Sequence, residues 1–163
     1  MGARAVTTRG KPARAAAKAL APEVDAWLKA AALDVADDGI VISDATPPDA
    51  PIVYVSPSFE RLVGYPAEEI LGTNCRMVQG PGTDRGTVKQ IAIALQEGRV
   101  FQGEILNARK DGTAFWNFLR IAPIRDASGR VTHHVGTQSD VTELHQARER
   151  EQELVDAVAH ASR

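Results

Sequence analysis

The stretch Asn74-Cys75-Arg76-Met77-Val78-Gln79-Gly80 contains the only cysteine of the sequence, and the rest of the chain is interpreted around it. Two amide side chains, those of Asn74 and Gln79, and the cation of Arg76 lie within this stretch. A lone cysteine is commonly a small buried hydrophobe. A thiol kept for its reactivity lies instead among polar and cationic groups. The polar neighbours of Cys75 favour the second interpretation, and the first stays open.

Length and composition indicate one globular domain with extra helices at its ends. The chain has 163 residues, a hydrophobic fraction of 44% and a formal net charge of -2. A packed core is therefore expected, and the overall charge indicates neither a nucleic-acid nor a membrane partner. One cysteine allows no internal disulfide and no paired-cysteine metal site. Because no apolar segment of signal or transmembrane length follows the basic start, we expect a cytoplasmic protein.

The N-terminal part divides into an arm and a helix. Residues 1–22 are rich in Ala, Arg and Lys and predict a flexible basic arm, with a transit peptide as the alternative. Pro22 suits a helix start, and residues 23–36 predict an N-terminal flanking helix. Its apolar residues recur at helical spacing: Val24, Trp27, Leu28, Ala31 and Val35. This apolar face must cover either its own domain or a second subunit.

Residues 37–142 alternate between strand and helix signals and predict an α+β core. Strands at 39–44 and 52–55 flank a proline-rich loop and predict a hairpin. Helices follow, capped by Ser56 and by Thr83 or Asp84. Three further strands are predicted at 101–107, 114–123 and 131–140, separated by turns at Asp111-Gly112 and Ser128-Gly129. We expect one five-stranded antiparallel sheet with short helices on one face.

Residues 143–163 predict a C-terminal helix with a heptad-like apolar seam interrupted by Glu151. The seam residues are Leu144, Ala147, Glu151, Leu154, Val158 and Ala161. An isolated helix of this length is marginally stable. The helix therefore pairs with a second copy, continues into a further segment, or packs back on the sheet.

Three amide side chains fall on the three predicted late strands, at Asn107, Asn117 and Gln138. Each amide offers both a donor and an acceptor, which suits the edge of a flat heteroaromatic ligand held between a sheet and helices. Taken singly, each is better explained as an exposed or turn amide. Together, in apolar strands, they indicate a binding site, because an unpaired buried amide costs about 1–3 kcal/mol.

The segment from Gly72 to Gly80 resembles the Gly-x-Asn-Cys-Arg-Phe-Leu-Gln signature of LOV (light-oxygen-voltage) domains. These are the flavin-binding, blue-light-sensing branch of the PAS superfamily. The resemblance covers about residues 36–142 and implies a PAS fold, in a short bacterial LOV protein or the sensory part of a longer one. Further matching segments are Gly80-Pro81-Gly82-Thr83-Asp84-Arg85, Ile105-Leu106-Asn107, Lys110-Asp111-Gly112, Phe115-Trp116-Asn117 and Gly136-Thr137-Gln138.

The resemblance implies a blue-light photoreceptor that holds flavin mononucleotide (FMN) non-covalently in darkness. Under light the Cys75 thiol would add to flavin carbon C4a, and the bond would revert in darkness. Asn107 and Asn117 would bind the pyrimidine edge, and Gln138 would contact the group beside N5. The remaining implied contacts are Asn74 and Gln79 with the ribityl chain and ring edge, Arg76 with the phosphate, and Val41, Ser43 and Leu119 lining the pocket.

Two departures from the family pattern bear on these expectations. Ala92 occupies the position of a second phosphate arginine, and Arg85 and Lys89 on the same helix are the expected partial replacements. Phosphate should thus be held less strongly, and riboflavin should compete with FMN. Met77 and Val78 replace Phe and Leu, which should alter packing near the thiol and the rate of dark reversion.

A photoreceptor module that signals through Gln138 to flanking helices and a dimer is the leading interpretation, and it is not an enzyme. A flavin oxidoreductase or thiol catalyst is disfavoured, because the sequence has no second Cys, no nicotinamide fingerprint and no histidine arrangement tied to Cys75. A PAS module that uses its flavin for redox sensing in darkness is the other alternative. The downstream effector is not indicated by the sequence.

Overall fold

A computed structural model describes residues 22–162, so the arm predicted for residues 1–22 lies outside this range apart from Pro22. The order of helices and strands confirms the prediction. The elements are α1 (Pro22–Asp34), β1 (Gly39–Asp44), β2 (Ile52–Val55), α2 (Pro57–Val63), α3 (Ala67–Ile70), the 3-10 helix η1 (Cys75–Val78), α4 (Arg85–Gln96), β3 (Phe101–Ala108), β4 (Ala114–Arg125), β5 (Val131–Asp140) and α5 (Thr142–Ala161).

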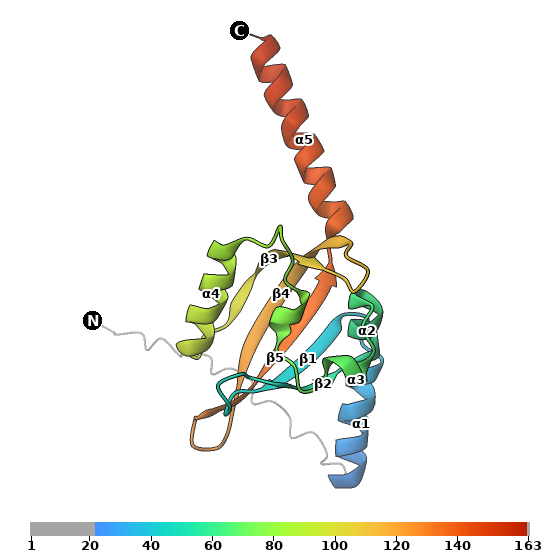
Figure 1. Cartoon of the computed structure of the whole chain (residues 1–163), viewed down its shortest axis with the longest axis vertical. Helices are drawn as coiled ribbons and strands as arrows, with labels where there is room; N and C mark the ends of the chain where they lie inside the picture. Colours follow the sequence, from blue (N-terminus) through green and yellow to red (C-terminus); the bar gives the residue numbers. More distant parts are fainter. Residues whose placement is uncertain (1–21, 163) are drawn as a thin grey trace, which may run out of the picture.

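The strands form one antiparallel sheet in the order β2-β1-β5-β4-β3, which confirms the predicted α+β class. In Figure 1, α2, α3 and η1 lie in front of this sheet and α4 lies beside β3. Strand β4 continues past its predicted end at Pro123 to Arg125. The pairing of β4 with β3 ends at Ile121, which pairs with Phe101 at the start of β3. Beyond Ile121, β4 pairs only with β5, so Pro123 lies in an edge position, where proline is tolerated.

Local capping explains where the helices begin. The Ser56 side chain accepts a hydrogen bond from the Phe59 amide at the start of α2, and Asp84 does the same for Thr87 in α4. Gly64 ends α2 in the left-handed region at φ 77°, a conformation that glycine adopts without strain. The predicted capping residues of α2 and α4 are therefore confirmed.

The core lies between the sheet and the short helices. Its buried members are Val41, Ile52, Val55, Phe59, Val63, Ile70, Val78 and Phe115. Val41 and Phe115 project from the sheet, whereas Phe59 and Ile70 come from α2 and α3. The odd-numbered residues of β3 and β4 and the even-numbered residues of β5 share this inward face, because directly paired residues point the same way.

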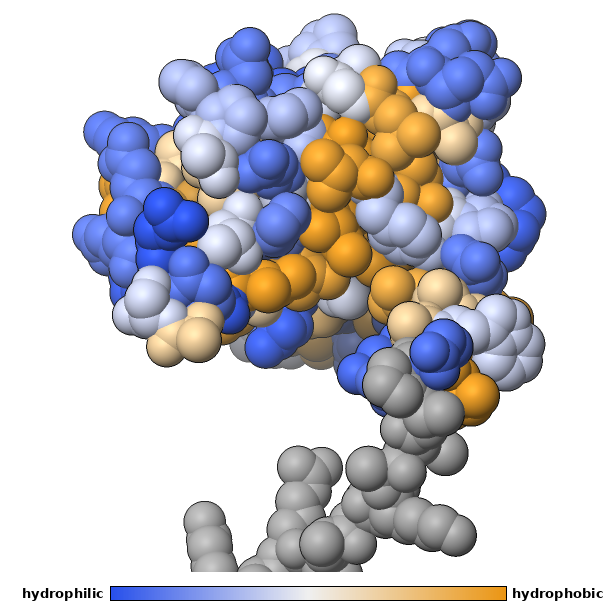
Figure 2. Space-filling model, turned by 90° about the horizontal axis from the view of Figure 1, so that it is seen from below, coloured by the Kyte–Doolittle hydropathy of each residue, from blue (hydrophilic) through white to orange (hydrophobic). Residues whose placement is uncertain are grey.

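The two flanking helices leave this layered core, with α5 projecting from one end in Figure 1. The α5 helix has no buried residue, and Trp27 of α1 is 68% exposed. The apolar face of α1 is therefore not covered by the described part of its own chain. Figure 2 shows a hydrophobic area with hydrophilic margins on the face seen from below. None of the described helices is both long enough and apolar enough to cross a bilayer.

Candidate functional site

A hydrogen-bonded cluster of three amides lies on the inward face of the sheet. The Asn117 Nδ2 atom donates to Asn107 Oδ1 and to Gln138 Oε1, both at 2.9 Å. All three residues are buried. The sheet thus brings together the three amides predicted from the sequence, because β4 pairs with β3 on one side and β5 on the other.

The Asn117 Oδ1 atom is buried and has no hydrogen-bond partner within residues 22–162. Since an unpaired buried acceptor costs about 1–3 kcal/mol, the cluster is suited to a ligand that supplies a donor at this point. A planar heteroaromatic ring with an imide N–H has the required chemistry. The orphaned acceptor therefore fits the kind of ligand that the three amides predict.

Cys75 is the first residue of η1, and Asn74 caps it by accepting a hydrogen bond from the Arg76 amide at 2.9 Å. The cysteine residue is exposed, yet burial raises the pKa of its thiol to about 11. Protein atoms thus surround the thiol closely enough to disfavour its ionised form, while the residue stays accessible to solvent. The thiol is consequently neutral near pH 7, unlike the ionised cysteines of thiol enzymes.

The loop that follows η1 is hydrogen-bonded to β3, next to Asn107 of the amide cluster. Gln79 and Asn107 form an isolated antiparallel bridge. The Thr83 hydroxyl donates to the Leu106 carbonyl at 2.6 Å and accepts from the Gly80 amide at 2.9 Å. The signature stretch is therefore held against the strand that carries the first of the three amides.

The polar residues around the signature stretch make contacts within the protein. The Asn74 Nδ2 atom donates to the Asp49 carbonyl at 2.6 Å, and Arg76 lies 4.0 Å from the Asp49 carboxylate. The Arg85 guanidinium donates to Gln79 Oε1 at 3.1 Å. Arg76, Arg85, Lys89 and Ala92 are all exposed. Arg76 within η1 and Arg85 at the start of α4 thus each contact a polar group in or next to the signature stretch.

The residues predicted to line the pocket share the inward face with the amides. Val41 is 2% exposed, and Leu119 is paired directly with Gln138. Between them, Gly136 presents no side chain, and an added Cβ atom would lie 3.9 Å from Leu119 Cδ1. Ser43 lies further along β1, opposite His134.

His134 is a residue of this face that the sequence interpretation did not include. It is 9% exposed, and its Nε2 atom has no hydrogen-bond partner within residues 22–162. Burial lowers the pKa of its imidazole, and the nearby His133 lowers it further. The alternation of β5 was the available signal, because it places His134 on the same face as Gln138.

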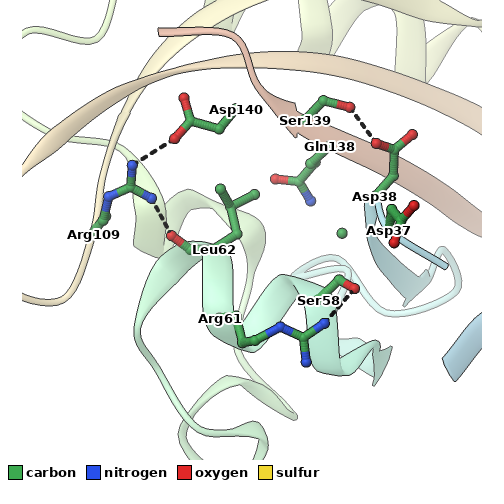
Figure 3. Close-up of a pocket in the computed structure, with 10 residues that line it drawn as sticks. Asp37, Asp38, Ser58, Arg61, Leu62, Arg109, Gln138, Ser139 and Asp140 are labelled. Atoms are coloured by element: carbon green, nitrogen blue, oxygen red, sulfur yellow. Dashed lines mark hydrogen bonds and ion pairs between the residues drawn. The ribbon is translucent and has the colours of Figure 1, made fainter. Parts of the chain in front are cut away.

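A separate open groove of about 480 Å³ adjoins the site at Gln138, whose side chain points toward it in Figure 3. Cys75 does not line this groove, so the groove is distinct from the face described above. Two contacts connect its elements. The Ser139 hydroxyl donates to Asp38 at 2.6 Å, and Arg109 donates to Asp140 at 2.7 Å. The groove therefore marks where the segments leading to α1 and α5 leave the core.

Comparison with known proteins identifies the family. A family model described as a PAS domain matches residues 37–143. The structure titled "The light state structure of the blue-light photoreceptor Aureochrome1 LOV" is 44% identical, with a TM-score of 0.66, and the match covers 75% of this chain and 96% of that one. This chain belongs to the LOV branch of the PAS superfamily. The predicted family and fold are thereby confirmed.

Other relatives agree with this LOV assignment. A structure titled "Flavin Analogue Sheds Light on Light-Oxygen-Voltage Domain Mechanism" is 41% identical with a TM-score of 0.69, covering 79% of this chain and 96% of that one. "Structure of an RNA-binding Light-Oxygen-Voltage Receptor" is 35% identical with a TM-score of 0.81, covering 97% and 44%. Both structures share the fold across most of this LOV chain.

Two curated relatives are much longer than this LOV chain. Phototropin-2 of Oryza sativa subsp. japonica is 46% identical over 121 residues, which are 74% of this chain and 13% of the relative. A blue-light-activated histidine kinase of Brucella canis is 44% identical over 103 residues, which are 63% of this chain and 21% of the relative. The chain thus spans about a fifth or less of these relatives.

Proposed function

We propose that this LOV chain is the sensory module of a blue-light photoreceptor and that it binds a flavin. The buried acceptor of Asn117, at the centre of the amide cluster, is the observation that carries the proposal. The relatives support it, since their names include a blue-light-activated kinase and a blue-light photoreceptor. A bound flavin supplies blue absorption and, once excited, a ring carbon that accepts a sulfur nucleophile.

The proposal gives Cys75 the role of the photochemical nucleophile. Because the pKa of its thiol is raised to about 11, the sulfur carries its proton in darkness. A neutral thiol brings both the sulfur and a proton to the site, and it does not react as a thiolate before illumination.

FMN is the proposed flavin, with riboflavin as a competitor. Arg76 in η1 and Arg85 at the start of α4 carry guanidinium groups, which suits a phosphate that extends out of the site. Both are exposed, so solvent and salt weaken their attraction for the phosphate. Lys89 contributes a further positive charge on α4, and Ala92 contributes none.

Gln138 is the proposed relay from flavin to the flanking helices, because it is buried in the amide cluster and also lines the groove. The two residues that follow it make the next contacts. Ser139 donates to Asp38 in the segment after α1, and Asp140 accepts from the Thr142 amide at 3.0 Å at the start of α5. A rotation of the Gln138 amide would thus act on both flanking helices.

The proposed output is an arrangement of two copies through the flanking helices, without an enzymatic reaction in this chain. We propose residues 37–142 as the sensor core, with residues 23–36 and 143–163 as flanking helices. Exposed apolar residues on both helices support pairing, among them Trp27, Leu154 and Val158. Kinase activity is named for the Brucella canis relative, and RNA binding for the protein so titled.

Absorption spectroscopy of the purified chain and of Cys75→Ala tests the proposal. The wild type is expected to show a blue absorption band that bleaches under blue light and recovers in darkness. The Cys75→Ala variant is expected to retain the flavin and its fluorescence without that bleaching. A colourless wild type after flavin reconstitution would refute flavin binding. Bleaching of Cys75→Ala to the same product would refute the role of Cys75 and favour another flavin chemistry.

A further inference from the structure

Two residues of the described chain have buried side-chain polar atoms without a hydrogen-bond partner, Asn117 and His134. Both lie on the inward face of the sheet. Leaving such an atom unpaired is unfavourable, because the hydrogen bonds it made with water are not replaced. The Asn117 acceptor is explained by the flavin site. The His134 Nε2 atom lies on the same face, outside the amide cluster, and calls for an explanation of its own.

The strand register places His134 at the opposite end of the candidate site from the amides. It is paired with Ser43 on β1 and with Pro123 on β4, whereas Gln138 is paired with Leu119. His134 and Gln138 are four positions apart along β5, which corresponds to a distance of about 13 Å. Gly136 lies midway between them, so no β5 side chain projects from this face between the imidazole and the amide.

We propose that His134 is a ligand-facing residue of the flavin site, beneath the end of the ring system remote from the amides, and that it makes flavin binding depend on pH. This inference rests on the proposed flavin-binding function. An elongated tricyclic ring whose polar edge meets Asn117 extends along this face toward His134. The imidazole then meets the carbocyclic end of the ring.

The direction of the pH effect follows from burial. The strand neighbours Ser43 and Pro123 carry no charge, and His133 is the one titratable group of the described chain that acts on the His134 pKa. A flavin over the imidazole removes further water from it and disfavours the protonated form. The flavin-bound protein therefore takes up this proton at lower pH than the free protein, and acidification weakens binding. One linked proton changes the dissociation constant by at most about tenfold per pH unit.

The test is the dissociation constant of riboflavin, measured by fluorescence between about pH 5 and 8, the range in which histidine titrates. Riboflavin is the probe because the FMN phosphate has a second pKa near 6 and would titrate in the same range. We expect the wild-type constant to rise on acidification and that of His134→Phe to stay nearly constant. His133→Phe is the matched control, since the adjacent histidine faces the other side of the sheet. It should keep the rise on acidification, with a midpoint at higher pH because His133 no longer lowers the pKa of His134.

A second variant, His134→Gln, keeps a polar side chain and removes the titration, so it provides the same comparison if phenylalanine is too large for the site. Equal pH slopes in the wild type and in both His134 variants would overturn the inference. Failure of the wild type to bind riboflavin or FMN at any pH would instead overturn the proposed function. The two failures are therefore distinguishable.

Discussion

Asn117 is fully buried and connects three strands through one side chain, because its amide nitrogen serves acceptors on both β3 and β5. A leucine of similar size would remove this donor and leave Asn107 Oδ1 and Gln138 Oε1 without it. We predict that Asn117→Leu lowers the free energy of unfolding of the flavin-free protein by about 1–3 kcal/mol, measured by urea denaturation. It should also raise the dissociation constant for flavin.

Gln102→Leu is the matched control, since Gln102 is an exposed amide on the outward face of β3. Surface substitutions of this kind change stability by about 0.5 kcal/mol or less. If Asn117→Leu and Gln102→Leu unfold at the same urea concentration and bind flavin equally, the amide cluster does not have the role given to it.

Ala92 on α4 leaves this helix without a positive charge at that position, which bears on the selection between FMN and riboflavin. We predict that Ala92→Arg raises the affinity for FMN relative to riboflavin by about fivefold at low salt, because an exposed charge pair contributes up to about 1 kcal/mol. The gain should shrink as salt is added. Competition binding measures the ratio, with Ala92→Gln as a control of similar polarity without the charge. An unchanged ratio would place the phosphate away from α4.

Helix α5 is attached to the outward face of the sheet by its first turns. The His145 ring stacks on Trp116 with centroids 3.8 Å apart, and its Nδ1 atom lies 2.9 Å from Glu104. Arg148 donates to the other oxygen of the same carboxylate. Glu104 of β3 thus contacts both His145 and Arg148 of α5. The later turns of α5 project away from the core.

We predict that Glu104→Gln loosens the first turns of α5 and increases their amide hydrogen exchange about fivefold, equivalent to roughly 1 kcal/mol. Glu149→Gln is the matched control. Glu149 lies 3.3 Å from the same histidine but belongs to α5 itself, so its loss leaves the attachment to β3 intact. Equal exchange in the two variants would show that Glu104 does not hold the helix.

The attachment of α5 should also depend on pH and should weaken on acidification. Hydrogen bonds from Arg148 and then His145 hold the pKa of the Glu104 carboxyl below its usual range. A carboxylate with a depressed folded pKa stabilises the fold above its unfolded pKa, near 4.3, and ceases to do so as pH falls through the folded value. We predict that the protection of α5 amides against exchange, relative to their intrinsic rates, falls below about pH 4 in the wild type. The fall should be smaller in Glu104→Gln, where Asp140 still titrates at the start of α5. Trp116 fluorescence provides an independent measurement.

Across the whole molecule, helix caps could be predicted from the sequence because they depend on residues close together in the chain. Contacts between distant strands could not be predicted in the same way, because they depend on strand register. Ser56 and Asp84 show their capping role in sequence because the backbone groups they serve lie three residues away. The inward face of His134 follows from the alternation of β5, but its place beside Ser43 and Pro123 depends on strand register. The groove beside Gln138 depends on the meeting of four distant segments. Neither is encoded within a short window of sequence.

The apolar seam of α5 is the proposed contact between two copies of the chain. Leu154 is 67% exposed, and together with Val158 it lies on one face of the projecting helix. We predict that the chain is dimeric and that Leu154→Lys shifts it toward monomer, because the charge must be buried between the copies. Light scattering in darkness and under blue light measures the molecular mass of both proteins.

Gln152→Lys adds the same charge two residues away, on the opposite face of α5, and should leave the dimer intact. A chain ending at residue 142 should resemble Leu154→Lys if α5 provides most of the contact. If it stays dimeric while Leu154→Lys also stays dimeric, the copies meet through α1 or the sheet instead. A wild type that is monomeric in both darkness and light would leave α5 to act on a different partner and would refute pairing as the output.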